Sequence, residues 1–255
     1  MKYFLMSDIH SNLEALETVL KFQSAFNADM NIVLGDITGY GPDPTLCVQK
    51  VSALNNLKVV LGNHDKVVAG LAVPLHFNRN AIAAAYLNIR SIGKQEALWL
   101  SMLQECVNIS NEIVMFHGYP DNVEEYILNP VSALPVFCQF RETPVKIGFY
   151  GHTHLPALFE FDEDTETVTD LEIKIKRTCQ IDLSTKKKYL FNPGSVGQPR
   201  DGNPDACFAV VDVDFENNKA VFTVHRKPYP IAECQKKMTL ASYPEPLITR
   251  LEFGF

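Results

Sequence analysis

Short apolar runs that alternate with helical patterns dominate the first 155 residues of this chain. Runs this short and this rich in Val, Ile, Phe and Tyr predict buried strands. The first intervening segment places Leu13, Leu16, Val19 and Leu20 at helical spacing. Strands and helices in alternation predict a layered α/β fold. The apolar runs are KYFLMSD, NIVLGD, LKVVLGNHD, NEIVMFHG and KIGFYGH.

Helix signals mark the segments between these runs. Ser11 and Glu14 form a capping-box pattern at the start of the first helix. Pro44 suits the first turn of a second, shorter helix. Two further helices are predicted around NAIAAAYLNIR and KQEALWLSML, where the apolar neighbours of Trp99 indicate a core position.

After His154 the apolar residues alternate with polar ones, which is typical of strands with one solvated face. We expect an antiparallel meander here that forms a second sheet packed on the first. No internal repeat or low-complexity linker divides the chain, so we expect one domain over residues 1–255. The alternating segments are ALFEF, TVTDLEIKI, KKYLFN, CFAVVDVD and AVFTVHRK.

Composition excludes several classes of protein. A formal net charge of -7 argues against an extended nucleic-acid surface, because such surfaces neutralise phosphates with Lys and Arg. The apolar runs fall far short of a membrane span, and MKYFLMSDIH carries a charge too early for a secretory signal. The six Cys show no C-x-x-C spacing, so we expect neither a zinc ribbon nor a disulfide framework. We expect a cytoplasmic protein.

Polar donor side chains follow the carboxyl end of every one of the five predicted strands. Sites in open α/β sheets form outside the carboxyl ends of strands, so these side chains should converge. Any one of them alone is weak evidence, but five strand ends of this kind are hard to assign to packing. They are Asp8 and His10, Asp36, Asn63 and His64, His117, and His152 and His154.

The GHTH stretch contains two histidines, His152 and His154, that are two residues apart. On extended backbone, side chains two residues apart point the same way, so we expect His152 and His154 to leave the strand end on a common side. A lone H-x-H pair is as easily a solvated loop. The whole donor set, however, is too large for one catalytic zinc and suits two ions that share a bridging carboxylate. Oxygen and nitrogen donors without a thiolate favour Mn, Fe, Zn or Ni.

The motifs SDIHSN, LGDITGYGP, LGNHD, FHGYP and GHTH, in this order, resemble those of the calcineurin-like metallophosphoesterases. The resemblance covers Met1 to about Pro156, with a further match at NPGSVGQPRDGNPDA. It implies two facing mixed β-sheets flanked by helices, the four-layer α/β/β/α sandwich of that family. Many relatives carry an Asp soon after GD, but the GDITGYGP motif of this chain lacks it. In this respect the motif is similar to that of one bacterial-type branch of the family. The departure leaves the metal positions intact and bears only on which substrate is preferred.

The resemblance also implies roles for the donor residues. Asp8, His10 and His154 would hold one ion, Asn63, His117 and His152 would hold the other, and Asp36 would bridge them. His64 corresponds to the histidine that contacts the phosphoryl group or the leaving oxygen, and Asp65 would orient it. Two divalent transition metal ions, with Mn first and Fe, Zn or Ni as alternatives, are the implied cofactors.

The expected reaction is hydrolysis of a small phosphate ester by attack of a metal-bound hydroxide, because two cations can clamp phosphoryl oxygens and acidify a water. Three further residues are candidate substrate contacts. Asn12 lies near a helix N-terminus and could bind phosphate or only cap the helix. Tyr40 and Arg200 could contact substrate, Arg200 through charge-assisted hydrogen bonds, although a turn aromatic and a surface cation are the plainer interpretations.

Phosphodiesterase activity is the first expectation. A phosphatase of phosphoproteins or small monoesters and a hydrolase of dinucleoside polyphosphates remain alternatives. From another class, a protein-binding scaffold of the same fold is the rival, although complete metal positions together with His64 favour an enzyme. The sequence leaves the oligomeric state open.

Overall fold

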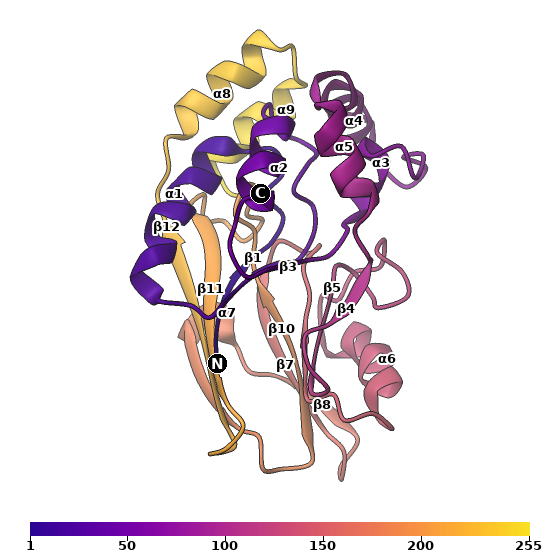
Figure 1. The fold of residues 1–255 in the computed structure, drawn as a ribbon, viewed down its shortest axis with the longest axis vertical. Coiled ribbons are helices and arrows are strands. Elements are labelled where there is room, and N and C mark those ends of the chain that lie inside the picture. The colour runs from indigo at the N-terminus through magenta and orange to yellow at the C-terminus, as the bar shows by residue number, and fades with distance from the viewer.

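The computed structural model describes residues 1–255, and two six-stranded mixed sheets face each other at its centre (Figure 1). The first sheet has the order β3-β2-β1-β11-β12-β9. Its strands are β1 (Lys2–Met6), β2 (Met30–Val33), β3 (Leu57–Val59), β9 (Thr178–Asp182), β11 (Ala206–Asp214) and β12 (Lys219–Lys227). The second sheet has the order β4-β5-β6-β10-β7-β8. Its strands are β4 (Cys106–Asn108), β5 (Ile113–Phe116), β6 (Ile147–Phe149), β7 (Pro156–Asp162), β8 (Thr167–Asp170) and β10 (Lys187–Pro193).

Helices cover the outer faces of both sheets. The α-helices are α1 (Leu13–Gln23), α2 (Pro44–Ser52), α3 (Asn63–Val68), α4 (Arg79–Ser91), α5 (Lys94–Ser101), α6 (Pro130–Phe140), α7 (Ile173–Lys176), α8 (Ile231–Leu240) and α9 (Glu245–Thr249). Two 3₁₀ turns, η1 (Ser24–Phe26) and η2 (Arg250–Glu252), complete the set. α6 lies on the outer side of the second sheet, whereas most of the other helices gather at the opposite end of the molecule (Figure 1).

The alternation of side chains along β1 shows how the layers are held together. Tyr3 and Leu5 point into the core between the two sheets, whereas Phe4 and Met6 pack on the outer side with apolar residues of α1 and α2. All four side chains are buried, and burial of each such side chain contributes roughly 1.5–3 kcal/mol. The result is the helix, sheet, sheet, helix layering that was predicted.

The division of the chain between the sheets differs from the predicted meander. β11, β12 and β9 extend the first sheet, in which β11 pairs antiparallel with β1. β10, β7 and β8 extend the second sheet, in which β10 pairs parallel with β6. The prediction of a separate C-terminal sheet is therefore wrong, because each sheet draws strands from both halves of the chain. Period-two patterning identifies strands but not their partners.

The start of α1 also differs from the prediction. Asn12, not Ser11, is the N-cap residue, and its side-chain oxygen accepts a hydrogen bond of 3.1 Å from the amide of Ala15. Glu14 forms an ion pair with Lys237 of α8 instead of closing a capping box. Trp99 is only partly buried, at the edge of the outer core.

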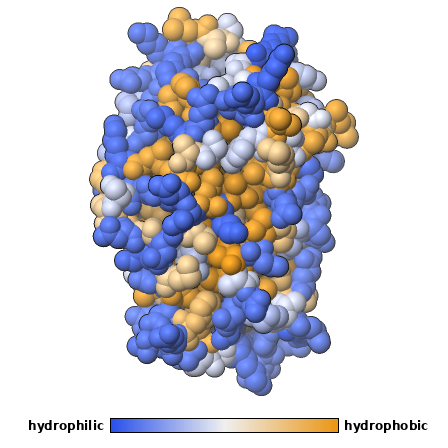
Figure 2. Space-filling model, in the orientation of Figure 1, coloured by the Kyte–Doolittle hydropathy of each residue, from blue (hydrophilic) through white to orange (hydrophobic).

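On the surface, hydrophobic residues gather in the middle of the face shown in Figure 2, between more hydrophilic regions above and below. Others protrude from the loop after α3, where Leu71, Val73 and Leu75 are exposed. No helix of the structure is both long enough and apolar enough to cross a membrane.

Candidate metal centre

The donor residues follow β1, β2, β3, β5 and β6 at one end of the two sheets, with Asn63 and His64 at the start of α3 and the others in loops. Neighbouring loops are joined through their main chains, with Asp8 N donating to Gly35 O at 3.1 Å and His10 N donating to Asp36 O at 2.9 Å. Five of the donors adopt left-handed backbone with positive φ, a conformation that costs free energy for residues other than Gly. They are Asp8, His10, Asp36, His152 and His154.

The geometry of GHTH differs from the extended pincer that was predicted. β6 ends at Phe149, and His152 and His154 have φ values of 67° and 62°. The left-handed turns send the two imidazoles apart, so that His154 faces Asp8 and His10 while His152 faces Asp36 and His117.

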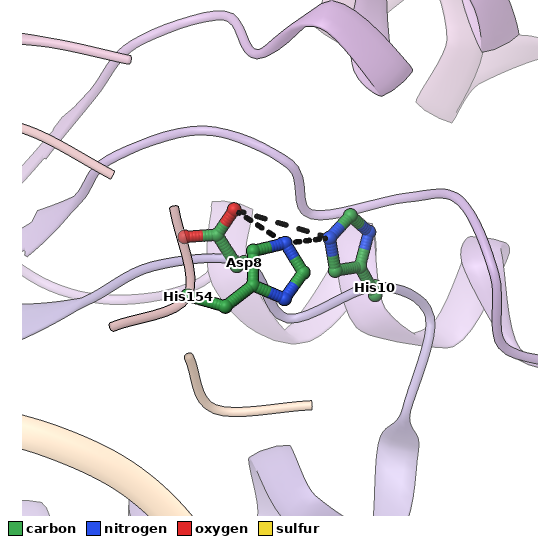
Figure 3. Close-up of side chains that lie close together, drawn as sticks. All are labelled: Asp8, His10 and His154. Carbon is green, nitrogen blue, oxygen red and sulfur yellow. Dashed lines mark hydrogen bonds and ion pairs between the residues drawn. The ribbon is translucent and has the colours of Figure 1, made fainter. Parts of the chain in front are cut away.

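We call Asp8, His10 and His154 the first cluster (Figure 3). Nε2 of His154 lies 3.3 Å from Oδ1 of Asp8 and 3.0 Å from Nε2 of His10. Nε2 of His10 lies 3.9 Å from the same Asp8 oxygen. All three side chains are buried. Three donor atoms therefore converge on one buried point.

We call Asp36, His117 and His152 the second cluster. Oδ2 of Asp36 lies 3.3 Å from Nε2 of His117 and 3.7 Å from Nε2 of His10, so this carboxylate faces both clusters. Asn63 donates from Nδ2 to a carboxylate oxygen of Glu124 at 3.1 Å. This bond orients the amide and leaves Oδ1 of Asn63 buried without a partner.

Main-chain carbonyls fix the tautomer of all four imidazoles. A carbonyl oxygen can only accept, so the nitrogen that bonds to it carries a proton, and in the neutral ring the other nitrogen has the lone pair that a metal can bind. The donors are Nδ1 of His10 to Thr38 O at 2.9 Å, Nδ1 of His117 to Leu34 O at 2.6 Å, Nδ1 of His154 to Gln198 O at 2.5 Å, and Nε2 of His152 to Glu124 O at 3.2 Å.

This arrangement fits divalent cations. Burial lowers the pKa of His10 and of His154 well below the usual value, so both rings are neutral and their Nε2 lone pairs face each other. Oδ1 of Asp8, Oδ1 of Asn63 and Nε2 of His117 are buried without hydrogen-bond partners. Orphaned acceptors cost free energy unless a cation satisfies them, and second bonds to carbonyls are the usual support of histidine ligands. The donors suit transition metals better than Mg²⁺ or Ca²⁺.

Without a cation, protons must offset the buried negative charge. Burial raises the pKa of Asp8 to about 7. Burial lowers the pKa of His117, but the charge and hydrogen bond of Asp36, the charge of Asp8 and the hydrogen bond to Leu34 together outweigh this effect and raise the pKa to about 10. Metal binding would replace these protons, as is general for metal ligands.

His64 lies beside both clusters, and its main-chain N–H donates to Oδ1 of Asp36 at 2.9 Å. Its ring packs between Tyr40 and Phe77, with centroids 4.5 Å and 4.2 Å away. Burial lowers the pKa of His64 to about 4, so the ring is neutral near pH 7. Gly39 is required at its position because a Cβ there would lie 2.4 Å from Nδ1 of His64.

Asp65 does not contact the imidazole of His64, contrary to the predicted orienting role. Its carboxylate accepts hydrogen bonds from the main-chain N–H of Ile37 and of Thr38, at 3.2 and 2.9 Å, and from the Thr38 hydroxyl at 2.8 Å. Asp65 therefore joins the loop after β3 to the loop after β2, and the aromatic neighbours of His64 orient its ring.

The three residues predicted to contact substrate differ in whether their polar groups are free to bind a ligand. The amide of Asn12 is fully used, because it caps α1 and donates to Gly197 O at 2.8 Å and to the Tyr229 hydroxyl at 3.1 Å. The structure therefore supports the capping interpretation of Asn12. Tyr40 lies over the first cluster, with its ring 4.7 Å from that of His10. The Arg200 guanidinium lies 5.8 Å from the Tyr40 ring.

Three residues near the centre escaped sequence reasoning. Glu124 orients Asn63, Tyr126 stacks on His152 with centroids 3.9 Å apart, and Phe77 covers His64. None of the three directly follows a strand end, so no sequence pattern distinguished them.

Comparisons with known proteins agree with this geometry. The sequence profile of the calcineurin-like phosphoesterase superfamily domain matches residues 1–216. The chain is 34% identical to the uncharacterized protein MJ0912 of Methanocaldococcus jannaschii, over 98% of this chain and 97% of that protein. It is 25% identical to phosphodiesterase YfcE of Escherichia coli, over 84% of this chain and 89% of YfcE.

Solved structures extend the likeness to the whole fold. A metallophosphoesterase from Sphaerobacter thermophilus superposes with a TM-score of 0.80 at 34% identity, and the match covers 100% of both chains. The profile match and this relative agree with the buried Asp and His clusters, which suit a metal-dependent hydrolase of phosphoric esters. The chain belongs to the calcineurin-like phosphoesterase superfamily.

Proposed function

We propose that this protein is a phosphodiesterase that acts on small phosphate diesters with two bound metal ions. The observation that carries the proposal is the pair of buried clusters that both face Asp36, since two adjacent cation positions suit the clamping of one phosphoryl group. The 25% identity to phosphodiesterase YfcE supports a diester over a monoester. We also propose that residues 1–255 act as one domain.

In this proposal each cluster holds one ion. Asp8, His10 and His154 bind the first, and Asn63, His117 and His152 bind the second, with Asp36 shared. We propose Mn for both positions, with Fe, Zn or Ni as alternatives, since imidazole nitrogen and oxygen donors without thiolate suit all four metals. Bound metals would neutralise phosphoryl charge and lower the pKa of a water so that a nucleophile is available near neutral pH.

The chain's own residues supply the remaining functions. The carbonyls of Thr38, Leu34 and Gln198 hold three imidazoles in the tautomer that leaves Nε2 free. His64 is neutral, so its ring N–H would stabilise charge on the departing oxygen as a hydrogen-bond donor.

The proposal is tested by stripping the protein of metal, restoring Mn and measuring hydrolysis of bis(4-nitrophenyl) phosphate and of 4-nitrophenyl phosphate. We expect faster turnover of the diester. Preference for the monoester would identify a phosphatase, and no turnover of either would direct the search to compounds with phosphoanhydride bonds. Either outcome would contradict the proposed diester activity.

A further inference from the structure

Tyr126 is the most exposed of the aromatic side chains that cover the metal centre. It is 43% exposed, whereas Tyr40 over the first cluster is 6% exposed and Phe77 over His64 is partly buried. The Tyr126 ring stacks on the imidazole of His152, with centroids 3.9 Å apart and an angle of 25° between the two rings. The imidazole occupies one face of the Tyr126 ring, so the exposed surface belongs to the opposite face and to the edges.

Only one side chain separates the Tyr126 ring from the other donors of the second cluster. That side chain is His152, and the donor atoms of His152, His117 and Asp36 lie within 4.8 Å of one another. In the proposed function the phosphoryl group binds between the two clusters, because Asp36 faces both of them. An ester group that extends from this phosphoryl group over the second cluster therefore comes within reach of Tyr126.

The segment that carries Tyr126 is acidic. Asp121 and Glu125 are exposed, and Glu124 is half-buried. The carboxylates of Asp121 and Glu124 accept hydrogen bonds from neutral side-chain amides, that of Glu124 from Asn63 at 3.1 Å. These partners leave the negative charge in place, so a carboxylate or phosphate over Tyr126 would be repelled by the side chains around it. The ester group that suits this side of the centre is uncharged.

Tyr126 also shields His152, which is only 4% exposed. Shielding requires an apolar side chain of about this size but no particular shape. A flat ring with one open face can in addition stack on an aromatic group of a ligand, and offset-stacked rings attract each other beyond the effect of the apolar area that they bury. The two roles are distinguished by comparing flat and puckered ligand rings of equal size.

We propose that Tyr126 is a specificity determinant whose open face stacks on an uncharged aromatic ring in the ester group of the substrate. This inference rests on the proposed function of the same centre and narrows its substrate class. The preferred substrates are phosphate diesters in which a neutral aromatic ring is joined to a phosphoryl oxygen by a short link. Tyr126 takes no part in bond cleavage.

Two phosphonates that cannot be hydrolysed test the proposal. Benzylphosphonate and (cyclohexylmethyl)phosphonate carry the same charge and rings of equal carbon number, but only the first ring is flat. Their Kd values are measured by calorimetry with the Mn-loaded protein. We expect benzylphosphonate to bind roughly two- to tenfold more tightly, as stacked aromatic pairs allow. An apolar surface without stacking would favour the cyclohexyl ring, which is the more hydrophobic of the two.

Three variants assign this preference to Tyr126. Tyr126→Leu keeps an apolar side chain over His152 but has no flat face, so the ratio of the two Kd values should fall to one or below. Tyr126→Phe should keep the ratio of the wild type. Tyr86→Leu is the matched control, because Tyr86 is similarly exposed, at 52%, on α4. Both phosphonates are measured on the same protein, so a change in metal content affects both Kd values and not their ratio.

Inhibition of bis(4-nitrophenyl) phosphate hydrolysis by the same phosphonates gives a second measurement, and the two Ki values should show the same ratio. Equal binding of the two phosphonates by the wild type, tighter binding of the cyclohexyl compound, or no binding of either would overturn the inference. An unchanged preference in Tyr126→Leu would also overturn it. If the diester is not hydrolysed, the proposed function fails, and the Kd ratio still decides whether Tyr126 binds an aromatic ring.

Discussion

His10 and His154, in the first cluster, lie near Tyr40 and Arg200, whereas His117 and His152, in the second, lie near Glu124 and Tyr126. The donor atoms of the two clusters are alike, and all four rings are fixed by carbonyls. The nearest charged side chain is an arginine for the first cluster and a glutamate for the second. The difference teaches that similar metal positions can have unequal surroundings because of neighbours that never touch the ion.

Asp36 belongs to the second cluster and also faces His10 of the first, so its replacement should affect both clusters. We expect Asp36→Asn to lower turnover at least about a thousandfold and to weaken both ions, because a shared carboxylate stabilises both cations. Metal content by mass spectrometry after dialysis checks this result. Asp212→Asn, an exposed position on β11, is the control. Loss of one ion only would show that Asp36 is not shared.

His64 belongs to neither cluster, so its removal should leave the binding of metal by both clusters unchanged. We expect His64→Ala to reduce kcat by roughly a hundred- to a thousandfold, typical of a lost donor at a developing charge. Metal content should stay at the wild-type value. His225→Ala, which removes a ring stacked on Phe208, is the control. Wild-type turnover in His64→Ala would remove this residue from the reaction.

Glu124 allows the two clusters to be separated experimentally. Removing its carboxylate frees the amide of Asn63, so Glu124→Ala should weaken one ion about ten- to a hundredfold and leave the other unchanged. A metal titration followed by calorimetry should then show two unequal steps. Glu125→Ala, at an exposed neighbour, should leave the titration as it is in the wild type. If Glu124→Ala weakened the binding of both ions equally, the inference that Glu124 supports only one of the two metal positions would be wrong.

The smallest expected effect concerns pH in protein free of metal. The raised pKa values of His117, about 10, and of Asp8, about 7, mean that the folded state holds protons that the unfolded state releases. Stability from such groups is lost as pH rises, here by about 1 to 2 kcal/mol per unit between pH 7 and 8. The pKa values of His64 and His152 are lowered in the folded state, so these residues change the stability only below pH 6.5, near the pKa of histidine in the unfolded chain.

Urea unfolding at a series of pH values measures this slope. Saturation with Mn should reverse it, because metal ions replace the protons and bind better as pH rises. His117→Gln should flatten the slope of the metal-free protein. A metal-free protein that is equally stable at pH 7 and 8 would show that these carboxylate and imidazole groups do not hold extra protons.

Much of the centre could be predicted because its donors follow strand ends, where local pattern and topology agree. The five strands and the positions of Asp8, Asp36 and His117 after them needed only period and composition. The backbone conformation of the donor residues could not be predicted from the sequence in this way. The left-handed turns at His152 and His154 depend on contacts with other loops, so the extended geometry expected from spacing was wrong.

Residues whose importance depends on distant neighbours could not be found in the sequence. Glu124 lies in a segment without a strand-end or helix-cap signal, and only the fold brings it to Asn63. Asp65 was assigned to His64 on the strength of the family resemblance, whereas its carboxylate accepts hydrogen bonds from the amides of another loop. The pairing of β11 with β1 across more than 200 residues is equally non-local.

That pairing has a consequence for how the protein is made. β1 leaves the ribosome before the other strands, yet its neighbour β11 does not end until Asp214, and His152 and His154 emerge between the two. Contacts so distant in sequence form slowly, because the intervening chain must first be ordered. The site that takes up metal is therefore completed late in synthesis, and a nascent chain that ends before β11 would present its histidines without the sheet that positions them.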